Sequence, residues 1–600
     1  MTMNSVEHIN DFSAELNTIV GDRPEQLLQY LYRIQYRYSF IPPQAVQLLA
    51  TRLGVSASTI RGVIEFYAFL HDTARGDFDI LFSDSITDHM LGSRKLAHNL
   101  CERLGVRFGE PRGDGRVSVD LTSCTGMCDQ GPAMLVNGWT VTRLDEARIE
   151  AIAGLIETAT PTDEWPAEFF AVEDNIQRGD LLLTSAISAG EPLQALQRKG
   201  SQRILEELDT SWLRGRGGAG FKTAAKWRFC RETEAQQRYV VCNADEGEPG
   251  TFKDRVLLNK YADEVFEGMT LCAGVIGASQ GYLYLRGEYR YLLEPLQAVL
   301  ERRRQAGLLG RNILGQDGFD FDIDIHMGAG AYICGEESSL IESLEGKRGI
   351  PRKRPPFPVT SGFRQKPTVV NNVETFIAAA QIAVHGADWF TAVGTGQSTG
   401  TKLLSISGDC ARPGIYEYPF GVTIRQILQD CGGGDAQAVQ VAGAAGSTVP
   451  QRDFDRRIDF DDIPTGGSFM VFNQQRELLD MVQNFTRFFA HESCGFCTPC
   501  RVGGTLLKDL VDKVHAGHGT KYDLQQMREI GALMRDTSHC GLGSTAPNPV
   551  LDTLEKFPAI YQSRLHDSGY EPAFDLDAAL QEARQISGRD QDTAHSETES

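Results

Sequence analysis

The chain has 600 residues, 41% of them hydrophobic and 23% charged, an ordinary composition for a globular protein. Because this length is too great for one hydrophobic core, several domains are expected. The net charge of −21 argues against nucleic acid or an anionic membrane surface as the main partner. The sequence contains neither a signal peptide nor an apolar stretch of about 20 residues, so we expect no direct membrane insertion and a cytoplasmic location. The 13 cysteines, an odd number at low density, favour metal-ligating thiolates over a disulfide framework.

The first part of the chain, residues 1–75, is predicted to be helical. Apolar residues recur at helical spacing after Pro24 and Pro43, and Ser56 and Ser58 are candidate caps of a third helix. From 76 to 160 the pattern changes to short strands and helices.

The largest block, residues 170–405, alternates strands with helical stretches, which predicts a mostly parallel, doubly wound sheet. Residues 406–472 form short strands with many glycines, and the helical period returns over 473–575. The end of the chain, 576–600, is predicted to be a polar, mobile tail. The fold class is therefore a multidomain α/β protein.

Four cysteines near the C-terminus form a candidate metal centre. Cys494, Cys497 and Cys500 have the spacing C-x2-C-x2-C, and Cys540 follows in a later segment. Three closely spaced thiolates can hold one face of a [4Fe–4S] cluster, and a distant fourth can complete it. A structural zinc site is the alternative, although such sites usually show two separate C-x2-C pairs.

The glycine-rich stretch at 215–220 matches G-x-G-x-x-G. A dinucleotide fingerprint needs a strand just before it, and residues 204–212 look helical instead. The remaining interpretation is an anion-binding loop with bare backbone N–H groups, where Arg216 and Lys226 supply positive charge. A flexible surface loop is the alternative.

Two acidic stretches, 243–250 and 328–337, each follow a predicted strand. In open α/β sheets, ligands bind beyond the carboxyl ends of the strands, so these residues are candidate ligand contacts. Helix capping is the alternative role for their carboxylates.

These motifs together resemble the NADH-binding flavoprotein family shared by respiratory complex I and soluble NAD-linked hydrogenases. The matching stretches are RGRGGAGF (214–221), NADEGEPGTFKDR (243–255), GAGAYICGEESSL (328–340), KRPPFP (353–358), VVNNVET (369–375) and SCGFCTPCR (493–501). The resemblance implies FMN, NAD and a [4Fe–4S] cluster as cofactors. It also implies a β-grasp domain over 406–472 and a helical bundle holding the cluster over 473–575.

The resemblance further implies the site residues. FMN would be surrounded by Gly215, Arg216, Gly217, Gly218, Lys226, Asn243, Asp245, Glu246, Tyr332, Gly335, Glu336, Asn371 and Asn372. The NADH side would be lined by Phe221, Phe229, Glu248, Glu337 and Phe357, with the two glutamates placed at the reaction and the phenylalanines stacking on adenine. Trp227 is interpreted as a core residue. A charged Glu248 near the adenosine ribose would repel a 2′-phosphate and favour NADH over NADPH.

Residues 24–140 resemble the thioredoxin-like subunit that accompanies this flavoprotein in complex I. That family binds a [2Fe–2S] cluster with two cysteine pairs, of which only Cys124 and Cys128 are present. Ser83 and Asp88 occupy the aligned positions of the other pair, and Cys101 lies in an apparent helix. We therefore predict that this domain has lost its cluster and serves as a scaffold or docking surface.

A thioredoxin-like unit fused to the flavoprotein most resembles the diaphorase subunits of soluble NAD-reducing hydrogenases. The implied partners are a ferredoxin-like iron–sulfur subunit and hydrogenase subunits. A flavoprotein component of an NAD-linked formate dehydrogenase or of complex I is the alternative enzyme. A non-catalytic NAD-binding scaffold is the alternative of a different class.

Overall fold

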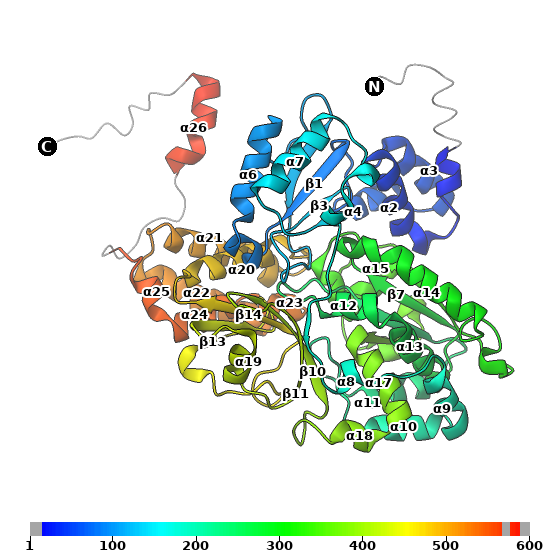
Figure 1. Ribbon diagram of the computed structural model, residues 1–600. Coiled ribbons are helices and arrows are strands. Elements are labelled where there is room, and N and C mark those ends of the chain that lie inside the picture. Colours follow the sequence, from blue (N-terminus) through cyan, green and yellow to red (C-terminus); the bar gives the residue numbers. More distant parts are fainter. Residues whose placement is uncertain (1–14, 567–575, 589–600) are drawn as a thin grey trace.

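The computed structural model describes residues 15–566 and 576–588 (Figure 1). Its N-terminal part is helical, as predicted, with α2 (Leu27–Tyr38), α3 (Pro43–Leu53) and α4 (Ala57–Ile64). Gly54 ends α3 with a left-handed φ of 66°, a conformation that glycine adopts without a steric penalty. The Ser56 hydroxyl accepts a 3.1 Å hydrogen bond from the Thr59 N–H and so caps α4.

The next domain is a small sheet with helices beside it. Its strand order is β2-β1-β3-β4, where β1 is parallel to β2 and antiparallel to β3. The elements are β1 (Phe78–Ser83), α5 (Ile86–Met90), α6 (Ser93–Leu104), β2 (Val117–Thr122), β3 (Met134–Val136), β4 (Trp139–Val141) and α7 (Glu146–Glu157). This domain has its own core, in which Ile80 and Val119 from the sheet meet Leu100 and Ile152 from the helices.

The predicted parallel sheet is confirmed in the largest block, with the order β8-β7-β6-β9 and all neighbours parallel. Its strands are β6 (Tyr239–Ala244), β7 (Gln280–Leu285), β8 (Asp322–Met327) and β9 (Thr368–Asn372). The accompanying helices are α8 (Leu181–Thr184), α9 (Glu191–Lys199), α10 (Ser201–Thr210), α11 (Thr223–Glu232), α12 (Lys253–Lys260), α13 (Ala262–Ile276), α14 (Leu293–Gln305), α15 (Glu337–Leu344), α16 (Pro358–Ser361), α17 (Val373–His385) and α18 (Ala387–Thr391).

The two faces of this sheet contribute to different cores. Val240 and Cys242 of β6 point into a core shared with α13 and α17. Tyr239 and Val241 point into a second core, which they share with α15 and with the N-terminal helices α2–α4. The N-terminal segment is therefore one of the layers that cover the parallel sheet, and Figure 1 shows it beside α15 and β7.

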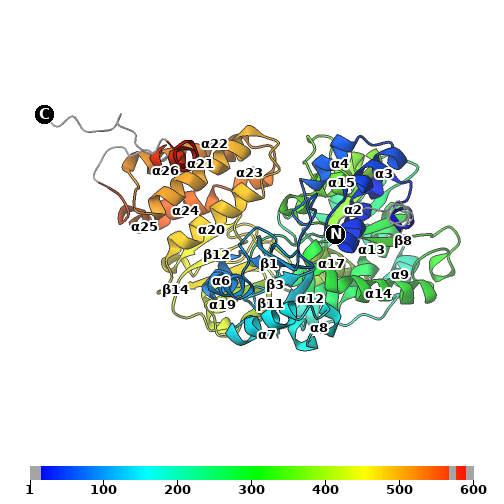
Figure 2. The same cartoon turned by 90° about the horizontal axis from the view of Figure 1, so that it is seen from above.

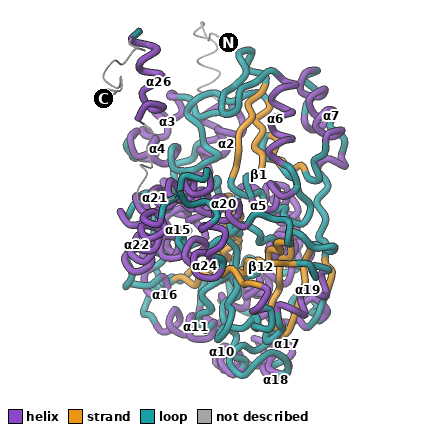
Figure 3. Tube along the Cα trace, turned by 90° about the vertical axis from the view of Figure 1, so that its left-hand side faces the viewer, coloured by secondary structure: helices purple, strands orange, loops and turns teal. Residues whose placement is uncertain are grey.

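A mixed sheet follows, with the order β13-β12-β14-β10-β11-β5. Its elements are β10 (Thr401–Gly408), β11 (Gly414–Pro419), α19 (Ile424–Cys431), β12 (Ala436–Val441), β13 (Ser447–Pro450) and β14 (Ser468–Asn473). The edge strand β5 (Ile176–Arg178) comes from the segment predicted to belong with the parallel sheet, but it pairs with β11. Figure 3 shows β1 and β12 in separate sheets of the molecule.

The C-terminal part is helical, with α20 (Leu478–His491), α21 (Thr498–His515), α22 (Lys521–Thr537), α23 (Gly541–Thr545), α24 (Asn548–Lys556) and α25 (Pro558–Gln562). Seen from above, these helices lie at one side of the molecule and the N-terminal helices at the other (Figure 2). Residues 576–600, predicted to be a tail, include the helix α26 (Leu576–Ser587), and 589–600 lie outside the described residues. None of the described helices has the length and apolarity needed to span a membrane.

A buried charge network joins the parallel-sheet block to the mixed sheet. Glu374 at the start of α17 forms ion pairs with Lys402 of β10 and, at 3.2 Å, with Lys253 of α12. All three side chains are at most 1% exposed. Burial opposes the ionisation of Glu374, but the two lysines lower its pKa, whereas burial lowers the pKa of Lys402 to about 7.

Glu374→Gln is expected to destabilise the protein by about 3–5 kcal/mol, because it removes the carboxylate that both buried lysines share. Thermal unfolding of the full-length chain, followed by calorimetry, would detect this as a lower midpoint. Glu301→Gln is the matched control, since Glu301 is exposed and its 3.7 Å contact with Arg304 is a surface ion pair. Equal midpoints for the two variants would contradict the expectation.

Candidate functional site

The main cavity has a volume of about 590 Å³ and lies beyond the carboxyl ends of β6 and β9, within the size range of cofactor sites. The parallel-sheet block, the mixed sheet and the C-terminal helices all contribute walls to it. Ten of the residues predicted for the site line it: Gly217, Gly218, Asn243, Asp245, Glu246, Glu248, Tyr332, Gly335, Glu336 and Asn372.

The glycine-rich loop contributes backbone rather than charge to this cavity. A Cβ on Gly217 would stand 2.9 Å from the Cβ of Asn372, so only glycine lets the loop pass this close. We predicted that the charge of Arg216 would face a bound anion, and the structure shows that this is wrong. Its buried guanidinium lies over the rings of Phe390 and Phe420 and donates a 2.8 Å hydrogen bond to the Thr399 carbonyl. The side chain is held there by cation–π contacts and carbonyl hydrogen bonds.

Three carboxyl groups at the cavity have pKa values raised by burial. Burial raises the pKa of Asp245 well above its usual range, and its Oδ2 atom is buried without a hydrogen-bond partner. Burial also raises the pKa values of Glu246 and Glu248 to about 7 each. Glu248 accepts hydrogen bonds from the Tyr332 hydroxyl at 2.5 Å and the Ala445 N–H at 3.0 Å.

Helix capping, the alternative role for these carboxylates, also occurs here. Glu246 accepts from the N–H groups of Asp254 and Arg255 at the start of α12, at 2.8 and 3.2 Å. Glu336 accepts from the Ser338 and Ser339 N–H groups, at 3.0 and 2.9 Å, and so caps α15. Because both residues also line the cavity, capping fixes them in place there.

The residues present at this cavity fit FMN. The unpartnered Asp245 oxygen needs a donor, and a flavin ring N–H or a ribityl hydroxyl group can supply one. The bare backbone at Gly217 and Gly218 leaves room for a phosphate or ring to approach.

Several predicted residues do not line this cavity. Lys226 donates 3.0 Å hydrogen bonds to Glu337 and to the Val370 carbonyl, so its charge is already paired. The Asn371 side chain accepts a 2.9 Å hydrogen bond from the indole N–H of Trp227. Trp227 is fully buried, as its interpretation as a core residue predicted. The Gly215 N–H donates 2.9 Å to the Phe221 carbonyl and closes the loop.

Three predicted phenylalanines lie outside the main cavity. Phe221 is 51% exposed, Phe229 is 49% exposed and Phe357 is 52% exposed. Phe229 belongs to α11, and α16, which directly follows Phe357, packs against that helix. Exposed aromatic faces of this kind are available for stacking on a base.

Some cavity residues were not among those predicted for the site. Lys253 lines the cavity and donates a 3.1 Å hydrogen bond to the Asn372 side chain. In the sequence, it was marked only by its place in the matching stretch 243–255. Leu542 and Asn548 come from the C-terminal helices and close the cavity from the far side. Only the packing of distant segments could have placed them there.

The four C-terminal cysteines meet where α20, α21 and α23 come together. Burial and the neighbouring thiolates of Cys497, Cys540 and Cys494 raise the pKa of the Cys500 thiol to about 11. Within 15–566 and 576–588, no three Cys, His, Asp or Glu side chains are arranged to hold a single metal ion. Three closely spaced thiols with a distant fourth beside them suit a [4Fe–4S] cluster.

The second cysteine pair lies in the N-terminal domain. The Cys124 and Cys128 sulfurs are 3.6 Å apart and buried. Beside them, the Ser83 hydroxyl donates 2.6 Å to Asp88, whose other oxygen accepts 2.9 Å from the Ala133 N–H. Burial raises the pKa of Asp88 to about 8, and a Cys124 thiolate adds to the shift. Ser83 and Asp88 therefore lie at the aligned ligand positions but satisfy one another.

Three family models match the chain. They are the Nuo51 FMN-binding domain over 208–381, the thioredoxin-like [2Fe-2S] ferredoxin over 13–157, and the NADH-ubiquinone oxidoreductase-F iron-sulfur binding region over 480–564. The last of these spans all four C-terminal cysteines. Together with the cavity they define an NAD-dependent oxidoreductase that uses FMN and an iron–sulfur cluster.

Comparison with full-length relatives and solved structures identifies the family within this class of oxidoreductases. The chain is 45% identical over 570 residues to the NAD-reducing hydrogenase HoxS subunit alpha of Cupriavidus necator, covering 92% of this chain and 95% of the relative. It is 37% identical to a subunit of an NADH-quinone oxidoreductase of Rhizobium meliloti, covering 66% of this chain and 97% of the relative. A crystal structure of an NAD+-reducing [NiFe]-hydrogenase in the H2-reduced state superposes with a TM-score of 0.90 at 43% identity, covering 96% and 99% of the two chains. The chain belongs to the family of NAD-reducing hydrogenase alpha subunits.

The iron content is expected to be about four atoms per full-length chain rather than about six, because only the C-terminal site has four cysteines. Iron analysis after anaerobic reconstitution measures this directly. Cys497→Ser should lower the iron content, whereas the double variant Cys124→Ser/Cys128→Ser should leave it unchanged. About six iron atoms, with a [2Fe–2S] signal that the double variant abolishes, would show that the N-terminal domain retains its cluster.

Proposed function

We propose that the chain is the diaphorase subunit of a cytoplasmic NAD-reducing hydrogenase. Its partners would be a ferredoxin-like iron–sulfur subunit and the hydrogenase subunits that oxidise H2. The observation that carries this proposal is the extent of the similarity. The hydrogenase relative matches 92% of the chain, including the N-terminal domain, whereas the NADH-quinone oxidoreductase relative matches only 66%.

When bound, FMN exchanges a hydride with NAD(H) and single electrons with the [4Fe–4S] cluster. The protein supplies binding and orientation. Gly217, Gly218 and Asn372 would cradle the flavin, and the unpartnered Asp245 oxygen would accept a hydrogen bond from it. Cys494, Cys497, Cys500 and Cys540 would ligate the cluster.

The nicotinamide nucleotide would enter beside the aromatic side chains. The adenine ring would stack on the exposed faces of Phe221, Phe229 and Phe357. Glu337 would remain ion-paired with Lys226 until the nucleotide binds. Flavin chemistry of this kind would require no acid–base pair from the protein, whose residues would bind and orient the two rings.

The proposal is tested by purifying the chain with its natural partner subunits under anaerobic conditions. NADH-dependent dye reduction and H2-dependent NAD+ reduction are both expected. Dye reduction alone would move the electron source to formate or to a quinone-linked complex. Absence of both activities and of FMN would leave the non-catalytic scaffold as the explanation.

Glu248 is the proposed discriminator between NADH and NADPH. At about 5 Å and an effective dielectric constant of about 20, its charge would repel a 2′-phosphate by roughly 3 kcal/mol per unit charge. Because burial raises the pKa of Glu248 to about 7, the carboxyl is largely neutral below that pH and ionised above it. The full repulsion expected for a permanently charged carboxylate therefore develops only as the pH rises.

The preference for NADH in kcat/KM is accordingly expected to increase between about pH 6 and pH 8, approaching roughly a hundredfold at the upper end. Glu248→Gln should lower the preference and flatten this dependence, and Glu294→Gln, an exposed residue of α14, is the control. Steady-state rates with both nucleotides at each pH measure the ratio. A preference that is equally large in Glu248→Gln would assign discrimination to another residue.

A further inference from the structure

The segment that would hold a cluster in a thioredoxin-like ferredoxin lies against the parallel-sheet block. We call residues 123–130, which follow β2, the Cys124 loop. Arg286, at the end of β7, donates a 2.5 Å hydrogen bond to the Cys124 carbonyl. Gly126 lies on the ring of Tyr289, and a Cβ there would overlap the hydroxyl group and stand 2.7 Å from Cε1. Arg286 and Tyr289 are both buried.

The same two residues hold Glu246, which lines the flavin cavity. The Tyr289 hydroxyl donates 2.9 Å to the Glu246 carboxylate, and Arg286 donates to the Glu246 carbonyl. Arg286 is itself fixed by Glu288, whose oxygens accept at 2.6 and 3.0 Å. Every step from the Cys124 loop to the cavity is therefore a short contact between buried groups.

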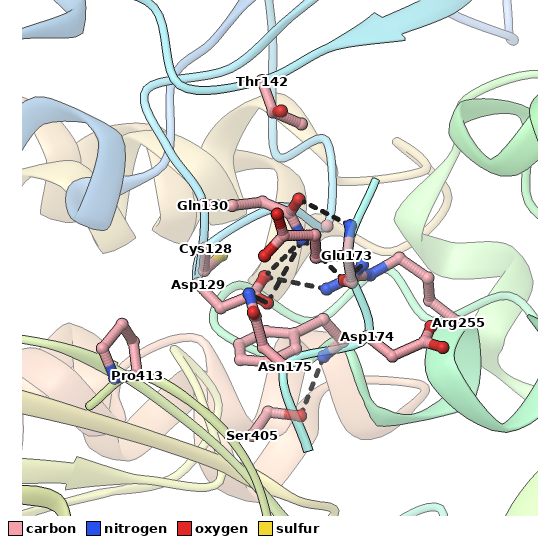
Figure 4. Close-up of polar contacts among 12 residues, drawn as sticks. Cys128, Asp129, Gln130, Thr142, Glu173, Asp174, Asn175, Arg255, Ser405 and Pro413 are labelled. Carbon is pink, nitrogen blue, oxygen red and sulfur yellow. Dashed lines mark hydrogen bonds and ion pairs between the residues drawn. The ribbon is translucent and has the colours of Figure 1, made fainter. Parts of the chain in front are cut away.

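A second connection runs through the start of α12. Arg255, whose N–H donates to Glu246, forms a 2.8 Å ion pair with Asp129 of the Cys124 loop, and both side chains are fully buried. Asn175 donates 2.7 Å to the other Asp129 oxygen, and Gln130 exchanges hydrogen bonds with the backbone of Glu173. Figure 4 shows Asp129 between Asn175 and Arg255, beside the segment that carries Glu173, Asp174 and Asn175.

We propose that the Cys124 loop positions the Glu246 carboxylate at the flavin, through Tyr289, Arg286 and Arg255, and thereby sets the redox potential of the flavin. The proposal rests on the proposed function. The thioredoxin-like domain would act on the flavin through Glu246 and not as an electron carrier. Tyr289, Gly126 and Asp129 are positioning residues, since none of them lines the cavity.

The physical basis is the charge of Glu246 in a site of low dielectric constant. Burial and the neighbouring Asp254 raise its pKa to about 7, while Lys253, the α12 N–H groups and the Tyr289 hydroxyl favour the ionised form. A negative charge beside the flavin opposes the addition of electrons. Weakening the hydrogen bond from Tyr289 should therefore make the flavin easier to reduce.

The test is a spectroscopic redox titration of FMN in the full-length chain, with the visible spectrum recorded throughout. Tyr289→Phe is expected to shift the flavin midpoint potential to a more positive value. Gly126→Ala places the substitution in the thioredoxin-like domain, away from the cavity. It should shift the flavin midpoint potential in the same direction, because the new Cβ displaces the Tyr289 hydroxyl. The double variant should show no more than the larger single shift.

Two controls separate positioning from general damage. Tyr416→Phe removes a hydrogen bond of similar length, 2.8 Å to the Arg412 carbonyl, from a buried tyrosine of the mixed sheet. Gly109→Ala introduces a side chain at φ +81° in the same domain as Gly126, but with nothing within 4 Å. Neither control should change the potential.

If Gly126→Ala fails to fold, Asp129→Asn, which keeps the shape and removes the charge facing Arg255, replaces it and should also shift the potential. Wild-type potentials in folded, FMN-loaded Gly126→Ala and Asp129→Asn would overturn the role of the loop. A wild-type potential in Tyr289→Phe would overturn the role of Tyr289. Wild-type protein that binds no FMN would instead contradict the proposed function.

Discussion

The constraint on which this structure depends is that a parallel sheet must be buried on both faces. Helices from the same block cover one face of β6, through Val240 and Cys242. The other face, through Tyr239 and Val241, is covered by α15 together with the N-terminal helices. The N-terminal segment is consequently part of the flavin-binding body, and its backbone also bonds directly to the loop at 329–330 through Ala68 and Phe69.

This arrangement explains why Asp245, Glu246 and Glu248 have raised pKa values. The loops after β6 and β9 meet at one edge of the sheet, where the mixed sheet and the C-terminal helices close over them. Each added wall removes water from Asp245, Glu246 and Glu248, and desolvation favours their neutral forms. Hydrogen bonds to Glu246 and Glu248 partly offset this cost, whereas Asp245 keeps a free oxygen for a ligand.

In the thioredoxin-like domain, a hydrogen-bonded pair of side chains lies where the resemblance places two cluster ligands. Ser83 and Asp88 stand where two ligands are expected, and they bond to each other and to the Ala133 N–H. Buried polar groups such as these need hydrogen-bond partners, and here they supply them to one another. The surrounding loop, through Asp129 and Gly126, is at the same time held against Arg255 and Tyr289 of the neighbouring block.

The sequence by itself determined the local and the chemically specific features. Helical spacing located α2–α4, strand–helix alternation predicted the parallel sheet, and C-x2-C-x2-C identified three of the four candidate cluster ligands, because these patterns depend on residues close together in the chain. Tertiary structure decided which side chains face the cavity. Arg216 turns away because the rings of Phe390 and Phe420 and the carbonyl of Thr399 are available to it, and Leu542 and Asn548 enter because distant helices pack over the site. Such choices depend on contacts between segments far apart in the chain, which no local pattern encodes.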